Sequence, residues 1–129
     1  MPTLALIAHD QKKDELVDFC RRHRERIASL TLIATGTTGS RIAQATKLNI
    51  ECVLSGPLGG DAQIAARVAL HQVCGVIFLV DPLHAHPHEP DIQGLQRVCN
   101  VHNVPLATNL ATAELVIDDL TARAADARK

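Results

Sequence analysis

The chain alternates short apolar runs with longer segments in which apolar residues recur at helical spacing. Apolar runs typical of buried strands occupy Thr3–Ala8, Leu30–Ala34, Glu51–Leu54, Val76–Val80 and Pro105–Ala107. Helical patterns lie between and after them, near residues 12–26, 39–47, 61–71, 91–103 and 112–125. Strand and helix therefore alternate from one end of the sequence to the other.

This alternation predicts an α/β fold. Parallel strands need crossover connections, and helices on both faces cover a sheet whose strands are apolar on both sides. Leu16, Phe19 and Cys20 supply such an apolar stripe in the first helical segment. With no linker, repeat or low-complexity segment, we expect a single domain over residues 1–129, a three-layer sandwich with a five-stranded, mostly parallel sheet.

Polar clusters follow the predicted strands one after another. They are His9-Asp10, Thr35–Gly39, Ser55-Gly56, Asp81 and Thr108-Asn109. The carboxyl ends of parallel strands share one edge of the sheet, which is where open α/β sheets bind ligands. The segments expected at the opposite edge carry no comparable set, so the sequence predicts a small-molecule site at the carboxyl edge.

Composition argues against several other partners. The formal net charge is −1, and no long basic run points to nucleic acid or a membrane surface. Phe19 and Phe78 are the only aromatic residues apart from the histidines, which argues against a base-stacking platform. The N-terminus enters a strand directly, so we expect no signal peptide and a cytoplasmic protein. The four widely spaced cysteines are expected to be buried free thiols rather than disulfides or zinc ligands.

The segment Thr35–Gly39 has the composition of an anion cradle. Backbone N–H groups, threonine hydroxyls and a following helix can together hold a phosphate or a carboxylate. It lacks both the Gly-Lys-Ser/Thr of a nucleotide-binding P-loop and the third glycine of a dinucleotide fingerprint, so a monophosphate fits better. The alternative is a glycine turn with threonine capping.

Asp61 follows Gly59 and Gly60 at the predicted start of a helix. A carboxylate held there by a tight turn, beside an anion site, suits a general base. Aspartate is also a common helix N-cap, which is the alternative.

The loop at 81–91 concentrates histidines, carboxylates and prolines. His84, His86 and His88 could bind a metal, could be scattered surface residues, or could leave His88 as a metal-free acid, base or electrophile; the last is favoured because prolines interrupt the extended backbone. Asp91 follows Pro90 in a pattern typical of a helix start, so a partial helix cap is the alternative for this residue.

Lys13, close to the carboxyl edge, can reach an anion or remain solvated, and Asp10 can orient His9 or Lys13 or cap a helix. The other histidines, His23, His71 and His102, are expected to be solvated.

Together these segments resemble the methylglyoxal synthase family. The matching motifs are Ala-His-Asp at 8–10 with Lys13, Ala-Thr-Gly-Thr-Thr-Gly at 34–39, Leu-Ser-Gly-Pro-Leu-Gly-Gly-Asp at 54–61, Asp-Pro-Leu at 81–83, Pro-His-Glu-Pro-Asp at 87–91 and Pro-Leu-Ala-Thr-Asn at 105–109. The resemblance runs from Leu4 to about Ile117 and implies a flavodoxin-like or Rossmann-like sandwich.

The resemblance also implies an activity: conversion of dihydroxyacetone phosphate to methylglyoxal and inorganic phosphate through an enediolate, with no cofactor and no metal. Asp61 would take the carbon-bound proton, His88 would stabilise the oxyanion, and Asp91 would support them. The implied substrate- and phosphate-binding residues are His9, Asp10, Lys13, Thr35, Gly36, Thr37, Thr38, Ser55, Gly56, Asp81 and His88. The family is homohexameric and inhibited by its product phosphate.

Two other functions compete with this one. A non-catalytic regulatory domain of the same fold needs the anion cradle but not the base, so Asp61 together with His88 and Asp91 favours the enzyme. A metal-dependent hydrolase built on the loop histidines predicts activity that a chelator abolishes.

Overall fold

The computed structural model describes residues 1–83 and 89–127, with the backbone alone at residues 89–91. The strands of the described residues are β1 (Thr3–Ala8), β2 (Thr31–Thr35), β3 (Glu51–Val53), β4 (Gly75–Leu79) and β5 (Leu106–Ala107). They form a five-stranded sheet in the order β3-β2-β1-β4-β5, and each described neighbouring pair is parallel. The predicted α/β fold is confirmed.

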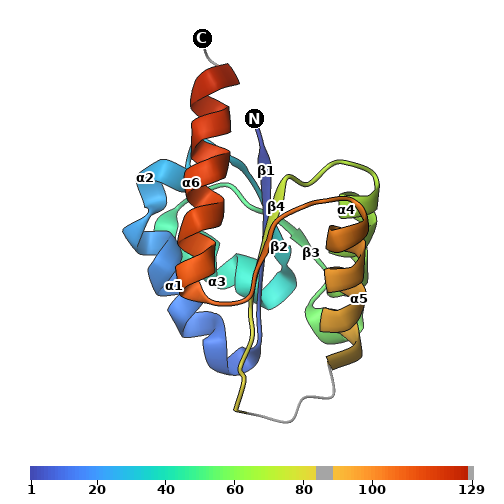
Figure 1. Ribbon diagram of the computed structural model, residues 1–129. Helices are drawn as coiled ribbons and strands as arrows, with labels where there is room; N and C mark the ends of the chain where they lie inside the picture. Colours follow the sequence, from blue (N-terminus) through green and yellow to red (C-terminus); the bar gives the residue numbers. More distant parts are fainter. Residues whose placement is uncertain (84–88, 128–129) are drawn as a thin grey trace.

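Helices cover both faces of this sheet (Figure 1). Those of the described chain are α1 (Lys13–Arg22), α2 (Arg24–Ile27), α3 (Gly36–Thr46), α4 (Gly60–Ala69), α5 (Glu89–Val101) and α6 (Leu110–Ala127), with short 3₁₀ turns η1 (Asp10–Lys12) and η2 (Gly56–Leu58). Helices α1, α2, α3 and α6 lie on one face, and α4 and α5 lie on the other. The molecule is therefore the three-layer sandwich that the alternating pattern predicts.

The sheet divides the apolar core in two, as the period of two along β1 requires. Leu4 and Leu6 pack with the α1, α3 and α6 layer, whereas Ala5 and Ile7 pack with the α4 and α5 layer. Residues 4–7 of this central strand are at most 2 % exposed. The strands thus form a rigid support, and the polar residues that follow them start from fixed positions.

The predicted helix over 12–26 is wrong as a single element. It is divided into η1, α1 and α2, with the break at His23, where φ is −109° and ψ is 20°. At this break the His23 ring lies 4.6 Å from the ring of Phe19, and Arg24 Nε donates to the Thr46 carbonyl at 2.5 Å. The ring contact within this segment and the hydrogen bond to α3 stabilise a bend that local periodicity does not reveal.

Two further expectations need correction. Cys52 is exposed and Cys74 is partly exposed, although all four cysteines are free as expected. His23 and His102 are half-buried rather than solvated, whereas His71 is exposed. Cys52 is exposed because it lies on β3, an edge strand of the described sheet.

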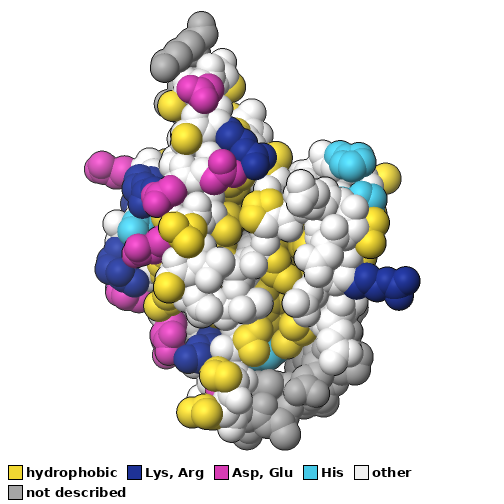
Figure 2. All heavy atoms as spheres, in the orientation of Figure 1, with side chains coloured by type: hydrophobic (Ala, Val, Ile, Leu, Met, Phe, Trp, Pro, Cys, Tyr) yellow, Lys and Arg dark blue, Asp and Glu magenta, His cyan; other side chains and the backbone are white. Residues whose placement is uncertain are grey.

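The face over α1, α2 and α6 carries acidic and basic side chains in alternation (Figure 2). Several are paired: Arg22 with Asp18, Arg26 with Asp118, and Arg123 with Asp119. This face therefore shows no field of one sign that a polyanion would need. No helix among the described residues is long and apolar enough to cross a membrane.

Candidate functional site

The carboxyl edge of the sheet brings together polar residues from distant parts of the chain. His9 follows β1, Thr35 ends β2, Ser55 follows β3 and Asp81 follows β4. Backbone hydrogen bonds join the neighbouring strand ends: His9 N–H donates to the Leu79 carbonyl at 3.1 Å, and Gly36 N–H donates to the Leu54 carbonyl at 3.3 Å. The predicted clusters accordingly share one edge of one sheet.

Helix α3 begins at Gly36, three residues earlier than its apolar pattern suggests. Thr35 stands at the N-cap but makes no side-chain capping hydrogen bond within the described residues, so the capping interpretation of this threonine is wrong. Thr37 is exposed in the first turn, and Thr38 is 1 % exposed. The Thr38 hydroxyl has no hydrogen-bond partner among the residues that the structure describes. A buried hydroxyl beside a helix N-terminus is suited to donate a hydrogen bond to an anion.

Asp61 lies inside helix α4, not at its N-cap. The N-cap is Gly59, whose φ of +104° suits glycine, and the helix starts at Gly60. Asp61 is only 5 % exposed and occupies the first turn, where the positive end of the helix dipole favours a carboxylate. The N-cap alternative is therefore wrong for this residue.

The loop after β3 brings Ser55 and Gly56 to this carboxylate. A Cβ built on Gly56 would lie 3.4 Å and 3.6 Å from the two carboxylate oxygens of Asp61, which shows how closely the backbone approaches them. Gly59 and Gly60 close the loop, since Gly59 N–H donates to Gly56 and Gly60 N–H donates to Ser55, both at 3.0 Å. The carboxylate is therefore held against a short, hydrogen-bonded turn.

His9 is 7 % exposed and is held on two sides. Its Nδ1 accepts a hydrogen bond from Asp81 N–H at 3.0 Å, and its ring meets that of Phe78 edge-on, with centroids 5.2 Å apart. Asp81 in turn accepts a hydrogen bond from Leu83 N–H at 3.1 Å, which shapes the turn that follows β4.

Lys13 and Asp10 form an ion pair beside His9. The Lys13 ammonium lies 2.6 Å from Asp10 Oδ1, with the lysine side chain 16 % exposed and the aspartate side chain 88 % exposed. Asp10 is not a helix cap, because His9 and Lys12 occupy the N-cap positions of η1 and α1. The lysine is therefore largely buried close to the site, and its charge is partly balanced.

The remaining predicted residues are less completely described. His84, His86 and His88 lie outside the described residues, as does the side chain of Asp91, whose backbone belongs to the first turn of α5. Among the described residues, no group of three or more histidine, cysteine or acidic side chains could hold a metal ion. The roles predicted for these loop residues stay predictions.

Two positioning groups escaped the sequence pattern. Gln63 Oε1 accepts a hydrogen bond from Leu54 N–H at 2.8 Å, and the Phe78 ring contacts His9. Gln63 looks like an ordinary exposed helix residue, and Phe78 looks like an ordinary apolar residue of a buried strand. Only the contact with a distant segment distinguishes either one.

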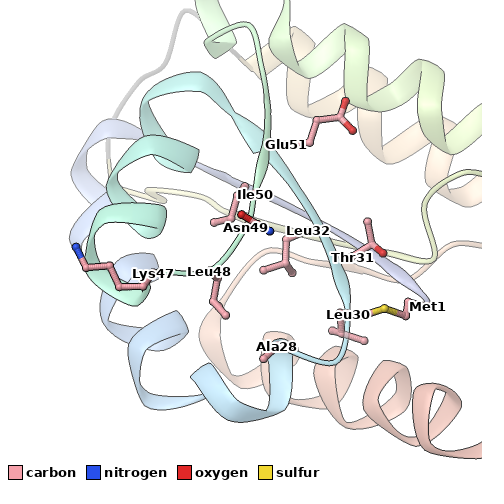
Figure 3. A pocket seen from close by; sticks show the side chains of 10 residues that line it. All are labelled: Met1, Ala28, Leu30, Thr31, Leu32, Lys47, Leu48, Asn49, Ile50 and Glu51. Carbon is pink, nitrogen blue, oxygen red and sulfur yellow. The ribbon is translucent and has the colours of Figure 1, made fainter. Parts of the chain in front are cut away.

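Two hollows border the sheet at opposite edges. One of about 550 Å³ lies at the carboxyl edge beside β4 and β5, between Lys12, Pro82, Gln96 and Asn109. Another of about 630 Å³ lies at the amino edge (Figure 3), where its lining includes Leu30, Leu32, Leu48 and Ile50, and the Lys47 side chain points away from them. Neither described lining includes a histidine or an aspartate, so the volume of a hollow does not locate the site. The polar residues at the strand ends, among them His9 and Thr35, place the candidate site at the carboxyl edge.

Comparisons with known proteins show which proteins this chain resembles. Residues 15–108 match the family model described as an MGS-like domain. The chain is similar to a methylglyoxal synthase of Thermus thermophilus, at 66 % identity over 117 residues that cover 91 % of this chain and 93 % of the relative. A methylglyoxal synthase of Cupriavidus metallidurans is 59 % identical over 92 % of this chain and 85 % of its own. The crystal structure of a methylglyoxal synthase from Elizabethkingia anophelis superposes with a TM-score of 0.85, at 43 % identity, covering 90 % of this chain and 76 % of that one.

Proposed function

The chain belongs to the methylglyoxal synthase family, and from this we propose that it converts dihydroxyacetone phosphate into methylglyoxal and inorganic phosphate at the carboxyl edge of its sheet. The observation that carries the proposal is the buried carboxylate of Asp61, held against Gly56 at the end of β3. The neighbouring N-terminus of α3 supplies an anion cradle. A base and an anion site in one place are what the elimination of a phosphate requires.

The reaction begins with a proton transfer from carbon. Asp61 takes a proton from the hydroxymethyl carbon of the substrate, and the electron pair of the broken C–H bond forms a carbon–carbon double bond while the carbonyl oxygen becomes negative. A positioned base typically accelerates such a step ~10²–10⁴-fold. Neutral or cationic donors beside the oxyanion lower the energy of the enediolate further. We assign this role to His88, with Asp91 as a supporting carboxylate and His9 as a second substrate contact.

The second stage releases phosphate. The hydroxyl group on the deprotonated carbon passes its proton to the enediolate oxyanion, and its oxygen forms an aldehyde carbonyl. The carbon–carbon double bond shifts toward the carbon that bears the phosphate, the bond from that carbon to the phosphate oxygen breaks, and phosphate leaves with the electron pair of that bond and takes up the proton held by Asp61. The remaining enol takes a proton on its terminal carbon and gives methylglyoxal. Atoms and charges balance without an oxidant, a reductant or a cofactor.

The residues around the proposed base bind the phosphate group and shape the rest of the pocket. We assign the phosphate group to the first turn of α3 and the loop after β3, with Lys13 as the nearby cation. The residues concerned are Thr35, Gly36, Thr37, Thr38, Ser55 and Gly56. Asp10 and Asp81 form the acidic part of the pocket, in contact with Lys13 and His9 respectively. The close approach of Gly56 to Asp61 supports a phosphate bound within reach of the base.

Family membership also supports a homohexamer, inhibition by product phosphate and a cytoplasmic location. Phosphate inhibition follows from the mechanism, since the product anion competes for the cradle that holds the substrate phosphate. Exposed apolar side chains such as Leu58, Leu70 and Leu115, between 65 % and 69 % exposed, are available for contacts between subunits.

The direct test is to supply purified protein with dihydroxyacetone phosphate and follow methylglyoxal and phosphate, with and without a chelator. We expect equal amounts of both products and no effect of the chelator. Chelator-sensitive product would instead favour a metal site at the loop histidines. Absence of methylglyoxal, with phosphate still bound, would overturn the proposal in favour of a regulatory domain.

A further inference from the structure

The backbone of Leu54 lies between the two helices that build the candidate site. Its N–H donates to Gln63 Oε1 of α4 at 2.8 Å, and its carbonyl accepts from Gly36 N–H at the start of α3 at 3.3 Å. Helix α4 carries Asp61, and the start of α3 is the anion cradle. One residue of the β3 exit therefore contacts both halves of the site.

We propose that Gln63 is a positioning residue: it holds the exit of β3 against α4 and so sets the distance between the Asp61 carboxylate and the anion cradle of α3. The inference rests on the proposed function, because it gives Gln63 a role in the placement of the proposed base. Gln63 itself touches neither of the reacting groups in this account and acts through Leu54.

Close packing makes the placement strict at this point. A Cβ on Gly60 would lie 1.9 Å from the Leu54 carbonyl oxygen, and a Cβ on Gly36 would lie 3.2 Å from the Val53 carbonyl oxygen. The β3 exit is thus pressed against the residue that precedes Asp61 and against the first residue of α3. With so little space on either side, any shift of the Leu54 backbone moves one helix start relative to the other.

The Gln63 side chain holds this backbone through a hydrogen bond and is not packed in the apolar core. It is exposed, two residues beyond the buried Asp61 on the same helix, and β3 is an edge strand of the described sheet. An N–H on an edge strand can bond to water when a side-chain acceptor is removed. Loss of the Gln63 carboxamide should therefore disturb the alignment of the site far more than it lowers stability.

The variants Gln63→Ala and Gln63→Glu distinguish the effect of the hydrogen-bond acceptor from the effect of side-chain size. Alanine removes the acceptor, whereas glutamate keeps an oxygen at the same reach. Gln44→Ala is the matched control, since Gln44 is an exposed glutamine on α3 outside the proposed site. Because a misplacement of about 1 Å can lower turnover roughly 100-fold, we expect kcat of Gln63→Ala to fall about tenfold. We expect KM for dihydroxyacetone phosphate and the melting temperature to stay near those of Gln44→Ala, and Gln63→Glu to recover most of kcat.

Amide hydrogen exchange of Leu54 gives a readout that does not depend on activity. We expect its N–H to exchange slowly in the wild type and in Gln63→Glu, and much faster in Gln63→Ala. Fast exchange in the wild type, or equal kcat in Gln63→Ala and Gln44→Ala, would overturn the inference, as would an equal loss in the alanine and glutamate variants. A wild type that forms no methylglyoxal but protects Leu54 contradicts the proposed function while leaving the Gln63 contact intact.

Discussion

The Nδ1 atom of His9 accepts a hydrogen bond from the backbone N–H of Asp81 at 3.0 Å, across 72 positions of sequence. A ring nitrogen that accepts a hydrogen bond carries no proton, so the neutral imidazole has its proton on Nε2. The edge-on Phe78 ring restricts rotation that would exchange the two nitrogens. His9 is thereby prepared to donate a hydrogen bond from Nε2, and it is not a base.

We expect long-range proton–nitrogen spectra of the protein near neutral pH to show His9 as the Nε2–H tautomer. The His9→Asn variant identifies the signals, because they disappear from its spectrum. The exposed His71 is the internal comparison for the assignment of the histidine signals. A proton found on Nδ1 of His9 would contradict the hydrogen bond with Asp81.

Replacement of the proposed base should abolish turnover and leave the fold intact. Asparagine is nearly isosteric with aspartate but cannot take a proton, so Asp61→Asn should lower kcat by ~10²–10⁴-fold. Phosphate binding, measured by calorimetry, should persist because the cradle of α3 is unchanged. Asp18→Asn is the control: Asp18 is an exposed acid that pairs with Arg22 on α1, and its loss should leave kcat near the wild-type value. Near-wild-type turnover by Asp61→Asn would remove Asp61 from the mechanism.

Two glycine-to-alanine changes should have opposite effects on stability. Gly60→Ala places a Cβ 1.9 Å from the Leu54 carbonyl oxygen. The backbone must shift to remove this overlap, and that distortion should lower the free energy of unfolding by roughly 1–3 kcal/mol. Gly94 lies within α5, and nothing stands within 4 Å of its added Cβ. Gly94→Ala should raise the free energy of unfolding by roughly 0.5–1 kcal/mol. Urea denaturation compares the two, and equal effects would contradict the packing described around Leu54.

The buried thiols make folding sensitive to alkali. Burial raises the pKa of Cys20 from its ordinary 9.0 to about 12 and the pKa of Cys99 to about 11. Above pH 9 the unfolded chain loses these protons before the folded chain does, so the unfolded state gains stability. The stabilising contribution is complete below about pH 9 and declines as the pH rises through 11 and 12.

Urea midpoints measured between pH 8 and pH 11 test this dependence. The urea midpoint of Cys52→Ser should decline with rising pH as that of the wild type does, since Cys52 is exposed. The midpoint of Cys99→Ala should decline less steeply, because a buried thiol has been removed. A thiol reagent should label Cys52 in the folded protein and reach Cys20 and Cys99 only on unfolding. Rapid labelling of Cys20 at neutral pH would show that it is not buried.

Local patterns were sufficient for the architecture and for the edge that carries the polar residues. Each strand is an apolar run of its own, such as Thr3–Ala8, and alternation with helices leaves few topologies other than a covered parallel sheet. The boundaries were less predictable. The α3 helix begins at Gly36 rather than Gly39. The apolar pattern does not indicate this first turn because glycine and threonine are weak helix formers, and the neighbouring β3 exit stabilises it.

The sequence by itself determined the layers, the parallel sheet and the gathering of His9, Thr35, Ser55 and Asp81 at one edge. These follow from periodicities of a few residues and from the rule that parallel strands end together. Only the tertiary structure decided that Asp61 is a buried helix residue instead of a cap, which nitrogen of His9 accepts a hydrogen bond, and that Gln63 holds Leu54. Such contacts join residues that local sequence does not relate, and their geometry is set by how closely whole elements pack.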